Sequence, residues 1–402
     1  MKWTVKATRT QILIFLFFAC ELLYPILSLL TNTGIANFLC DFLVAACFLY
    51  AAVHHLRNNK RFAWFLALAC GGCFLLSSLM HPEYHGVLFE EYNIWQYVFD
   101  LRQGIMLMLI LTLENDPQKM FDSLKIAAIP VWGAYTLRVV LGIGLSETTG
   151  SNHAYGYAFL FVTIIYTICF LRKKKLLYLG IVLVSLFQVV LFASRTAILS
   201  YVVFCVMYSL FYDSGKQYRQ KKTVRILVFA FLVFVLSSDV FLSLLSDAVS
   251  AVGLSSRIID SFLAGDIQLD GGRERTYLYA IELLKENPWG LGVYWDRYLC
   301  EFSYVHNFVL EVLVDFGWLF GGLLLWSLLK NIVQILRSDD RQWKTLFMVF
   351  FSLCMIRLFV SYSFWYDKNF WAMIAVIIGY RYSLKRERKN AGKPEVLKGT
   401  RQ

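Results

Sequence analysis

The side chains best suited to chemistry gather in one long polar interval between apolar runs. The interval covers residues 246–306 and contains Gly271-Gly272-Arg273-Glu274-Arg275, a glycine pair followed by two arginines. It ends at His306, where the next apolar run begins. Guanidinium groups form paired hydrogen bonds with phosphate oxygens, and an imidazole exchanges a proton near neutral pH. These residue types predict a site that binds a diphosphate and removes a proton.

A short amphipathic helix is predicted to begin at the two arginines. Apolar side chains then recur at helical spacing, at Tyr277, Ala280, Ile281 and Leu284. Asn287-Pro288 ends the pattern. We expect the helix to lie along the membrane surface with this stripe toward lipid. Its free N-terminal N–H groups, with Arg273 and Arg275, would form a diphosphate cradle; the alternative is a surface helix with capping charges. The interval has nine acids and five bases, a net charge of −4, which excludes a generic basic lipid-binding patch.

Four more arginines are predicted near the same membrane face. They are Arg102, Arg138, Arg195 and Arg357. At 1.5 Å rise per residue, each lies within roughly 10 Å of the outer end of its predicted span. Charged groups at this depth are costly and usually face a bundle interior or a watery cavity. One alternative is that each forms a structural ion pair with a carboxylate such as Glu21, Asp41, Asp100 or Asp239. Their common level favours a shared anion-binding cavity.

His306 also allows two interpretations. A histidine at the start of an apolar helix is commonly an amphipathic boundary residue. The predicted common face with the arginines favours a role as general base or as a group that positions a hydroxyl. Asn307 beside it and Glu311, one turn further along, are expected to support the site.

The composition indicates an all-α polytopic membrane protein. Of 402 residues, 58% are hydrophobic and 17% aromatic, and apolar runs near twenty residues recur along the chain. The first run has no cleavage site of small residues after it, so we expect a retained helix. About twelve spans are predicted, near 11–30, 35–56, 62–80, 95–113, 120–143, 153–171, 176–193, 196–212, 226–245, 307–329, 345–363 and 370–384.

The distribution of lysine and arginine predicts the orientation. With both termini inside, 27 of the 39 Lys and Arg residues fall in inner segments and 7 in outer segments. The net charge of +11 therefore reflects topology and a basic tail that faces anionic lipid, and gives no nucleic-acid signal. The predicted parts are a nine-helix membrane segment (1–245), an extracytoplasmic catalytic loop (246–306), a three-helix membrane segment (307–384) and a basic cytoplasmic tail (385–402).

Two absences limit the chemistry. No Asp-x-Asp pair occurs, and no predicted cytoplasmic segment is large enough for a nucleotide-binding domain. Cys70-Gly71-Gly72-Cys73 has metal-like spacing but lies in an apolar run without histidine, so ordinary helix packing is the better interpretation. We therefore expect no metal site and no cofactor, and no enzyme that uses a metal with a cytosolic sugar nucleotide.

Three stretches together resemble the O-antigen polymerase and ligase superfamily, the Wzy-type repeat-unit polymerases and their relatives. The first is Ser194-Arg195-Thr196-Ala197, a short outer turn. The second is Gly272-Arg273 followed by Glu286-Asn287-Pro288-Trp289-Gly290-Leu291-Gly292. The third is His306-Asn307-Phe308-Val309-Leu310-Glu311, then Phe316-Gly317 and Gly321. Their order, spacing and common predicted face carry the resemblance over roughly residues 190–325.

The resemblance implies inverting, metal-independent glycosyl transfer from an undecaprenyl-diphosphate-linked oligosaccharide to a glycan acceptor. It implies catalytic roles for Arg195, Arg273 and His306, with Arg275 a further diphosphate ligand. Arg102, Arg138 and Arg357 would add to the diphosphate site. The expected location is the bacterial cytoplasmic membrane, with the site facing outside. The product would be a surface polysaccharide of the cell envelope, such as a capsule, and a chain-length regulator is an expected partner.

Two alternatives stay open at this point. A ligase that moves a finished glycan to another acceptor would use the same residues. A lipid-linked oligosaccharide flippase would suit twelve spans with both ends inside. Carriers commonly contain repeated halves with binding groups at mid-membrane, whereas here no repeat is evident and the polar residues gather near one face. The polymerase is therefore the favoured hypothesis.

Overall fold

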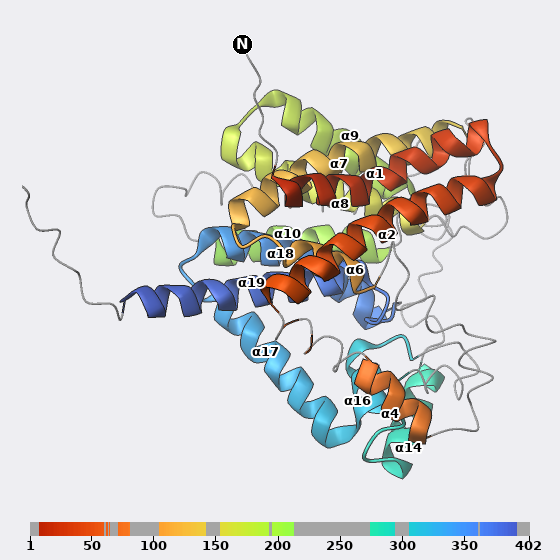
Figure 1. The fold of residues 1–402 in the computed structure, drawn as a ribbon, viewed down its shortest axis with the longest axis vertical. Coiled ribbons are helices and arrows are strands. Elements are labelled where there is room, and N and C mark those ends of the chain that lie inside the picture. Colours follow the sequence, from red (N-terminus) through yellow and green to blue (C-terminus); the bar gives the residue numbers. More distant parts are fainter. Residues whose placement is uncertain are drawn as a thin grey trace, which may run out of the picture.

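The computed structural model describes residues 8–59, 62, 64, 71–80, 104–141, 153–192, 195–212, 274–293, 305–360 and 362–391. All regular elements within these residues are helices (Figure 1). They are α1 (Arg9–Leu30), α2 (Thr33–Asn58), α4 (Gly72–Met80), α6 (Met106–Leu111), α7 (Pro117–Val140), α8 (His153–Lys173), α9 (Leu176–Phe192), α10 (Arg195–Phe211), α14 (Glu274–Glu286), α16 (Phe308–Phe316), the π-helix η4 (Gly317–Gly321), α17 (Gly322–Leu336), α18 (Arg341–Val360) and α19 (Lys368–Ala391).

Most predicted spans within the described residues correspond to a helix with similar bounds. Five helical segments are long and apolar enough to cross a membrane: Arg9–Leu30, Thr33–Asn58, Tyr155–Lys173, Phe308–Leu336 and Arg341–Val360. The predicted span 226–245 lies outside the described residues, as do parts of 62–80 and 95–113. The all-helical class is confirmed for the described chain, whereas twelve spans and their orientation stay predictions.

The helix ends follow local sequence signals. Thr8 accepts a hydrogen bond from the backbone N–H of Gln11, and the Gln11 side chain accepts one from the Thr8 N–H, which is a capping box at the start of α1. Asp116 caps α7 by accepting hydrogen bonds from the backbone N–H groups of Gln118 and Lys119, and Pro117 follows at the first helical position. These caps satisfy N–H groups that the helix itself leaves without acceptors.

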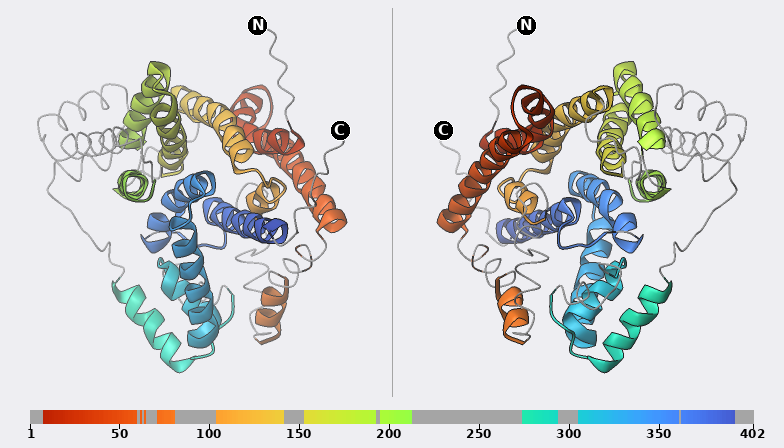
Figure 2. Two further views of the ribbon diagram at one scale, coloured as in Figure 1. Left: turned by 90° about the vertical axis from the view of Figure 1, so that its left-hand side faces the viewer. Right: turned by 90° about the vertical axis from the view of Figure 1, so that its right-hand side faces the viewer.

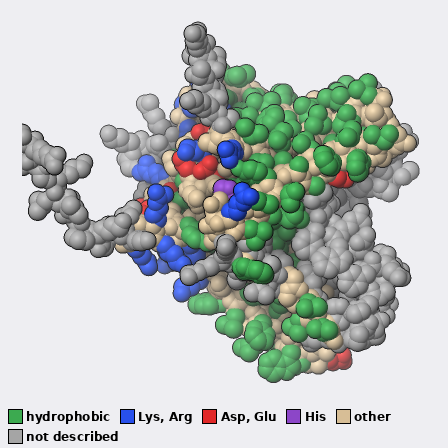
Figure 3. Space-filling view, viewed as in Figure 1, with side chains coloured by type: hydrophobic (Ala, Val, Ile, Leu, Met, Phe, Trp, Pro, Cys, Tyr) green, Lys and Arg blue, Asp and Glu red, His purple; other side chains and the backbone are tan. Residues whose placement is uncertain are grey.

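The helices differ in how much of their surface other helices cover. In α8, 89% of the most apolar window is buried, and α7 and α9 pack beside it. The corresponding fractions for α1 and α2 are 33% and 28%. Exposed Phe15, Ile26, Phe38 and Phe42 lie on these two helices. Figures 2 and 3 show α1 and α2 at one edge of the bundle, with an apolar surface. Such a surface suits contact with lipid tails.

The predicted span 307–329 begins close to the expected position but is not one regular helix. The helix α16 ends at Phe316, because Gly317 has a φ of 75° and interrupts the helical backbone. A π-helix and then α17 follow. The period of apolar residues continues through this break, so it does not show in the hydropathy pattern.

Two glycine motifs that are distant in sequence meet at this break. A Cβ added to Gly290, whose φ is +89°, would lie 2.4 Å from the backbone N of Gly317. Backbone N–H groups of Leu291 and Gly292 donate to the carbonyls of Val314 and Asp315, at 2.8 and 3.0 Å. These carbonyls are at the end of α16 and would otherwise have no helical partner. The glycines therefore allow residues 290–292 to complete the hydrogen bonds of a broken helix.

The apolar stripe of α14 contacts protein. The predicted helix is present as Glu274–Glu286, but Ala280 and Leu283 pack with Leu291, Val305 and Val314 in a small buried cluster. The expectation that this stripe faces lipid is therefore wrong for the residues in the cluster. The stripe instead fixes α14 against α16.

We expect Gly290→Ala to destabilise the contact between residues 287–293 and α16. A side chain at this φ costs about 1–3 kcal/mol, and the added Cβ would also overlap the backbone at Gly317. Thermal unfolding of the purified protein and proteolysis near residue 290 would measure the loss. The matched control is Gly180→Ala on α9, where a Cβ meets nothing within 4 Å. Equal unfolding midpoints for the two variants would contradict the close-approach argument.

Candidate functional site

His306 lies immediately before α16 with an unusual backbone. Its φ is +55°, a left-handed conformation that non-glycine residues rarely adopt. The Tyr277 hydroxyl on α14 donates to the His306 carbonyl oxygen at 3.4 Å, and the His306 side chain is half-buried. Strained backbone of this kind is concentrated at functional sites. The position of α14 on α16 thus holds the predicted base in a defined conformation.

The two residues expected to support His306 have structural partners. The Asn307 side chain accepts hydrogen bonds from the N–H groups of Val309 and Leu310, at 3.0 and 3.2 Å, and is the N-cap of α16. The Glu311 carboxylate is buried and accepts hydrogen bonds from the Ser363 hydroxyl and from the Phe364 N–H. Asn307 therefore begins the helix, and Glu311 joins it to residues 362–367, here called the α18–α19 connection.

Asp367 is the most enclosed charged group of this connection. Its side chain is 0% exposed, and one carboxylate oxygen accepts from the N–H groups of Asn369 and Phe370, at 2.7 and 3.0 Å. The other oxygen lies 3.8 Å from Nη1 of Arg357. Burial raises the pKa of Asp367, and the Arg357 guanidinium opposes that shift. Lowering the pH would therefore neutralise Asp367 earlier than an exposed aspartate and remove the counter-charge of Arg357.

A second carboxylate, Glu21 of α1, lies between two cations. Arg138 of α7 is 3.7 Å from one Glu21 oxygen, and Lys368 is 3.7 Å from the other. Lys368 is the residue after Asp367, so the two groups form one continuous network. It contains three cations, Arg138, Arg357 and Lys368, and two carboxylates. With all groups ionised, these five side chains carry one net positive charge.

Tyrosine rings enclose both arginines. The Arg357 guanidinium carbon lies 3.3 Å from the ring centre of Tyr362 and 4.6 Å from that of Tyr157. Arg138 lies 4.9 Å from the ring centre of Tyr24 and 5.1 Å from that of Tyr135. Aromatic faces attract cations and, as bulky groups, exclude part of the surrounding water. These rings keep both guanidinium groups in place near the end of the bundle.

Several segments with predicted site residues meet at the connection. The Tyr157 hydroxyl donates to Thr196, at 2.9 Å, which joins Arg357 to the start of α10. Gly104, which lies two residues after Arg102, donates its N–H to the Tyr366 carbonyl at 3.0 Å. Phe308 contacts the rings of Phe364 and Phe370, which brings the start of α16 to the same place. The connection therefore contacts α16 and Gly104, which lies just before α6, while Arg357 of α18 contacts α8.

The predicted site residues are described to different extents. Arg138 and Arg357 belong to the network, and each has the carboxylate partner that the ion-pair alternative required. Arg275 is exposed on α14. Arg195 begins α10, but its side chain lies outside the described residues, as do Arg102 and Arg273. The structure thus joins two of the arginines to one network and connects it with α16 through Glu311 and Phe308.

The sequence interpretation missed Asp367 and Lys368 as site residues. Lys368 counted only as an outer charge, and Asp367 received no role. A signal was present, because an aspartate directly before an apolar helix is a typical N-cap. That signal locates a helix start but does not reveal the approach of Arg357 or Glu21.

Comparison of the chain with protein-family models, with curated proteins and with solved structures gives no match.

We expect Glu21→Gln to lower stability by about 1–3 kcal/mol. The change leaves Arg138 and Lys368 without their shared counter-charge. The expected loss of stability is smaller than for a fully buried ion pair, because Arg138, Glu21 and Lys368 are 15–28% exposed. Thermal unfolding would measure it. The control is Lys119→Gln, which breaks an exposed pair with Asp116 and should change stability by less than about 0.5 kcal/mol. Similar effects of the two changes would show that the network is not a special stabilising feature.

Proposed function

We propose that this chain is a polysaccharide polymerase of the cytoplasmic membrane. It transfers oligosaccharide repeat units from an undecaprenyl-diphosphate carrier to a growing surface glycan. The observation that carries the proposal is the network at the α18–α19 connection, where three cations accompany two carboxylates. It adjoins α16, at whose start His306 has a left-handed backbone. A diphosphate complements such a network, and a nearby imidazole complements an attacking hydroxyl.

The proposed step forms one glycosidic bond and breaks another bond at the same carbon. The acceptor hydroxyl oxygen attacks the anomeric carbon, and the bond from that carbon to the carrier diphosphate breaks on the opposite face. His306 takes the hydroxyl proton or positions the hydroxyl for attack. The anomeric configuration inverts, and undecaprenyl diphosphate leaves with the electron pair of the broken bond. No metal or cofactor enters the step.

The cations act on the leaving group. Negative charge on the diphosphate grows as the bond breaks, so fixed cations stabilise the transition state more than the ground state. Arg138, Arg357 and Lys368 supply this charge from the described network, and Lys368 extends the set predicted from sequence. Arg195, Arg273, Arg275 and Arg102 complete the proposed diphosphate site. Arg275 is exposed on α14, so its side chain lies at the surface of the protein.

His306→Asn tests the proposed role of the imidazole with little change to the backbone. Asparagine tolerates positive φ better than most residues, so α16 should still begin at Phe308. We expect at least a ~100-fold loss of transfer rate, the usual contribution of a general base. The assay follows extension of lipid-linked oligosaccharide, extracted from the membranes of the source cells, by purified protein in EDTA. A glycan ladder built at the wild-type rate by His306→Asn would refute the assignment.

Arg357→Lys separates guanidinium geometry from charge. Lysine keeps the positive charge beside Asp367 but loses the planar fork and its stacking on Tyr362. We expect transfer to fall about 100-fold while the thermal midpoint stays close to that of the wild type. Lys330→Arg on α17, outside the network, is the control and should leave transfer unchanged. Wild-type activity in Arg357→Lys would indicate a purely structural ion pair.

The same assay distinguishes the alternatives. A wild type that attaches a preformed glycan to a different acceptor, without making a ladder, would be a ligase. A wild type that moves the lipid-linked unit across the bilayer of a proteoliposome without forming new bonds would be a flippase.

A further inference from the structure

A second cluster of cations lies at the other end of α19, away from the proposed active site. Lys368 begins this helix and Arg386 lies 18 residues later, which corresponds to ~27 Å along a helix axis. Figure 3 shows basic side chains gathered on the side of the molecule where the C-terminal half of α19 lies in Figure 1. This region has no role in the proposed transfer reaction.

Two adjoining cavities flank this part of α19. The first has a volume of about 450 Å³ and lies between the end of α2, the α6–α7 connection and α19. The second has a volume of about 540 Å³ and lies between α17 and α19. Phe62, Ile378 and Tyr382 line both. Each volume is in the range of about 300–1,000 Å³ that is common for small-molecule sites.

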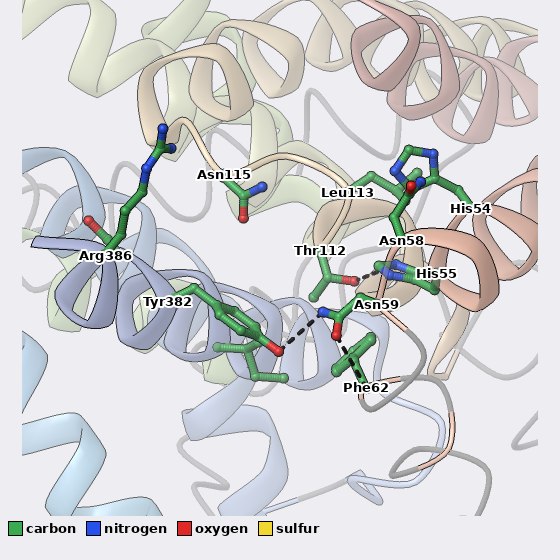
Figure 4. A pocket seen from close by; sticks show the side chains of 12 residues that line it. His54, His55, Asn58, Asn59, Phe62, Thr112, Leu113, Asn115, Tyr382 and Arg386 are labelled. Atoms are coloured by element: carbon green, nitrogen blue, oxygen red, sulfur yellow. Dashed lines mark hydrogen bonds between the residues drawn. The ribbon is translucent and has the colours of Figure 1, made fainter. Parts of the chain in front are cut away.

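The first cavity has a fixed shape because hydrogen bonds join its walls. Nε2 of His55 lies 3.0 Å from the Leu109 carbonyl oxygen and 3.1 Å from the Thr112 hydroxyl, which joins α2 to α6. The Asn59 amide donates to the Tyr382 hydroxyl at 3.2 Å, which joins α2 to α19 (Figure 4). These contacts make the cavity a part of the fold.

The charged side chains that line the two cavities are positive. The cations that line the two cavities are Arg381, Lys385, Arg386 and Arg388. No aspartate or glutamate lines either cavity, and none of the four forms an ion pair within the described chain. The nearest acidic residues along the sequence are Glu114 and Asp116, on either side of Asn115, and Glu387, which accepts a hydrogen bond from Ser383 at 3.5 Å. Asn58 and Asn115 add amide donors to the first cavity, and Figure 4 shows them around it with Arg386.

The apolar part of the lining distinguishes a lipid from a soluble anion. Phe62 is buried between the two cavities, and Leu384 lines the second. Trp64 is 63% exposed and Leu56 49% exposed, close in sequence to the cavity wall. Tyr382 combines a ring with a bonded hydroxyl, the arrangement that suits a membrane–water boundary. Four or more cations beside an apolar helix are a common recognition site for anionic lipid headgroups.

We propose that the first cavity binds the phosphate of an anionic phospholipid. Arg386, with the amides of Asn58 and Asn115, contacts the phosphate, and the acyl chains pass along the apolar wall at Phe62 and Tyr382. The cations of the second cavity attract the same headgroup. With the orientation predicted from the lysine and arginine distribution, this lipid belongs to the cytoplasmic leaflet. The proposal is independent of the proposed polymerase activity.

Native mass spectrometry of the purified full-length protein tests this site. The protein is titrated with phosphatidylglycerol and, separately, with phosphatidylcholine. We expect the wild type to retain phosphatidylglycerol at least ~10-fold more tightly. Arg386→Gln and Asn115→Asp should each weaken that binding about 10-fold, because one removes a charged donor and the other adds a carboxylate to the cavity.

Two matched changes outside the cavities separate a built site from general surface charge. Lys173→Gln removes one exposed cation at the end of α8, and Gln342→Glu adds one carboxylate to an exposed position on α18. Both should leave phosphatidylglycerol binding within about twofold of the wild type. Unchanged thermal midpoints of all four variants would show that each remains folded.

Three results would overturn the proposal. The first is equal weakening by a cavity change and its matched control, which would indicate nonspecific attraction to the surface. The second is wild-type binding in both Arg386→Gln and Asn115→Asp. The third is displacement of phosphatidylglycerol by equimolar inorganic phosphate or glycerol 3-phosphate, which would identify a site for a soluble anion.

Discussion

The burial of Asp367 is the constraint on which the arrangement of the site depends. Asp367 has no exposed surface. A buried carboxylate of this kind is stable only if each of its oxygen atoms faces a hydrogen-bond donor or a cation. Backbone N–H groups at the start of α19 supply one side, and Arg357 of α18 supplies the other. Together these contacts fix the end of α18 against the beginning of α19. Lys368 follows directly, and its ammonium group pairs with Glu21 of α1. Glu21 also pairs with Arg138, so α7 is joined to the same network.

In the proposed function, the network has a structural role and also binds an anion. Two carboxylates face three cations within these five side chains, and the buried carboxylates of Glu311 and Asp315 bond to the same connection, at Ser363, Phe364 and Trp365. Glu21 and Lys368 remain 17% and 28% exposed, whereas Asp367 is enclosed. A diphosphate that reaches the network can therefore compete with Glu21 for Arg138 and Lys368 while Asp367 still holds α19. The proposed substrate contact of Arg138 is therefore compatible with the ion pair that it forms with Glu21.

The sequence predicted the elements better than their contacts. The bounds of α1, α7 and α18, and the amphipathic helix that became α14, follow from apolar periodicity and capping residues, which act locally. The break at Gly317 could not be predicted from these local signals, because the residues on both sides of it are apolar. The left-handed backbone at Gly317 is required by the close approach of Gly290. The pairing of Glu21 with Arg138 was among the expected alternatives. The pairing of Asp367 with Arg357 was not among them, because it depends on how the α18–α19 connection folds back on α18. Asn307 and Glu311, which were expected to support His306, cap α16 and bond to the α18–α19 connection, respectively.

The two ends of α19 show how one helix can meet two different environments. At its start, cations are paired and lie against aromatic rings, which exclude part of the surrounding water, so an unpaired charge would be costly there. At its other end, four cations form no ion pair within the described chain, so solvent or headgroups can stabilise them. In the topology predicted from sequence, residues 370–384 span the membrane, and a separation of ~27 Å is close to the ~30 Å thickness of the hydrocarbon core. A helix whose first end belongs to a reaction site needs paired charges there. If its second end lies among lipid headgroups, unpaired cations are stable at that end.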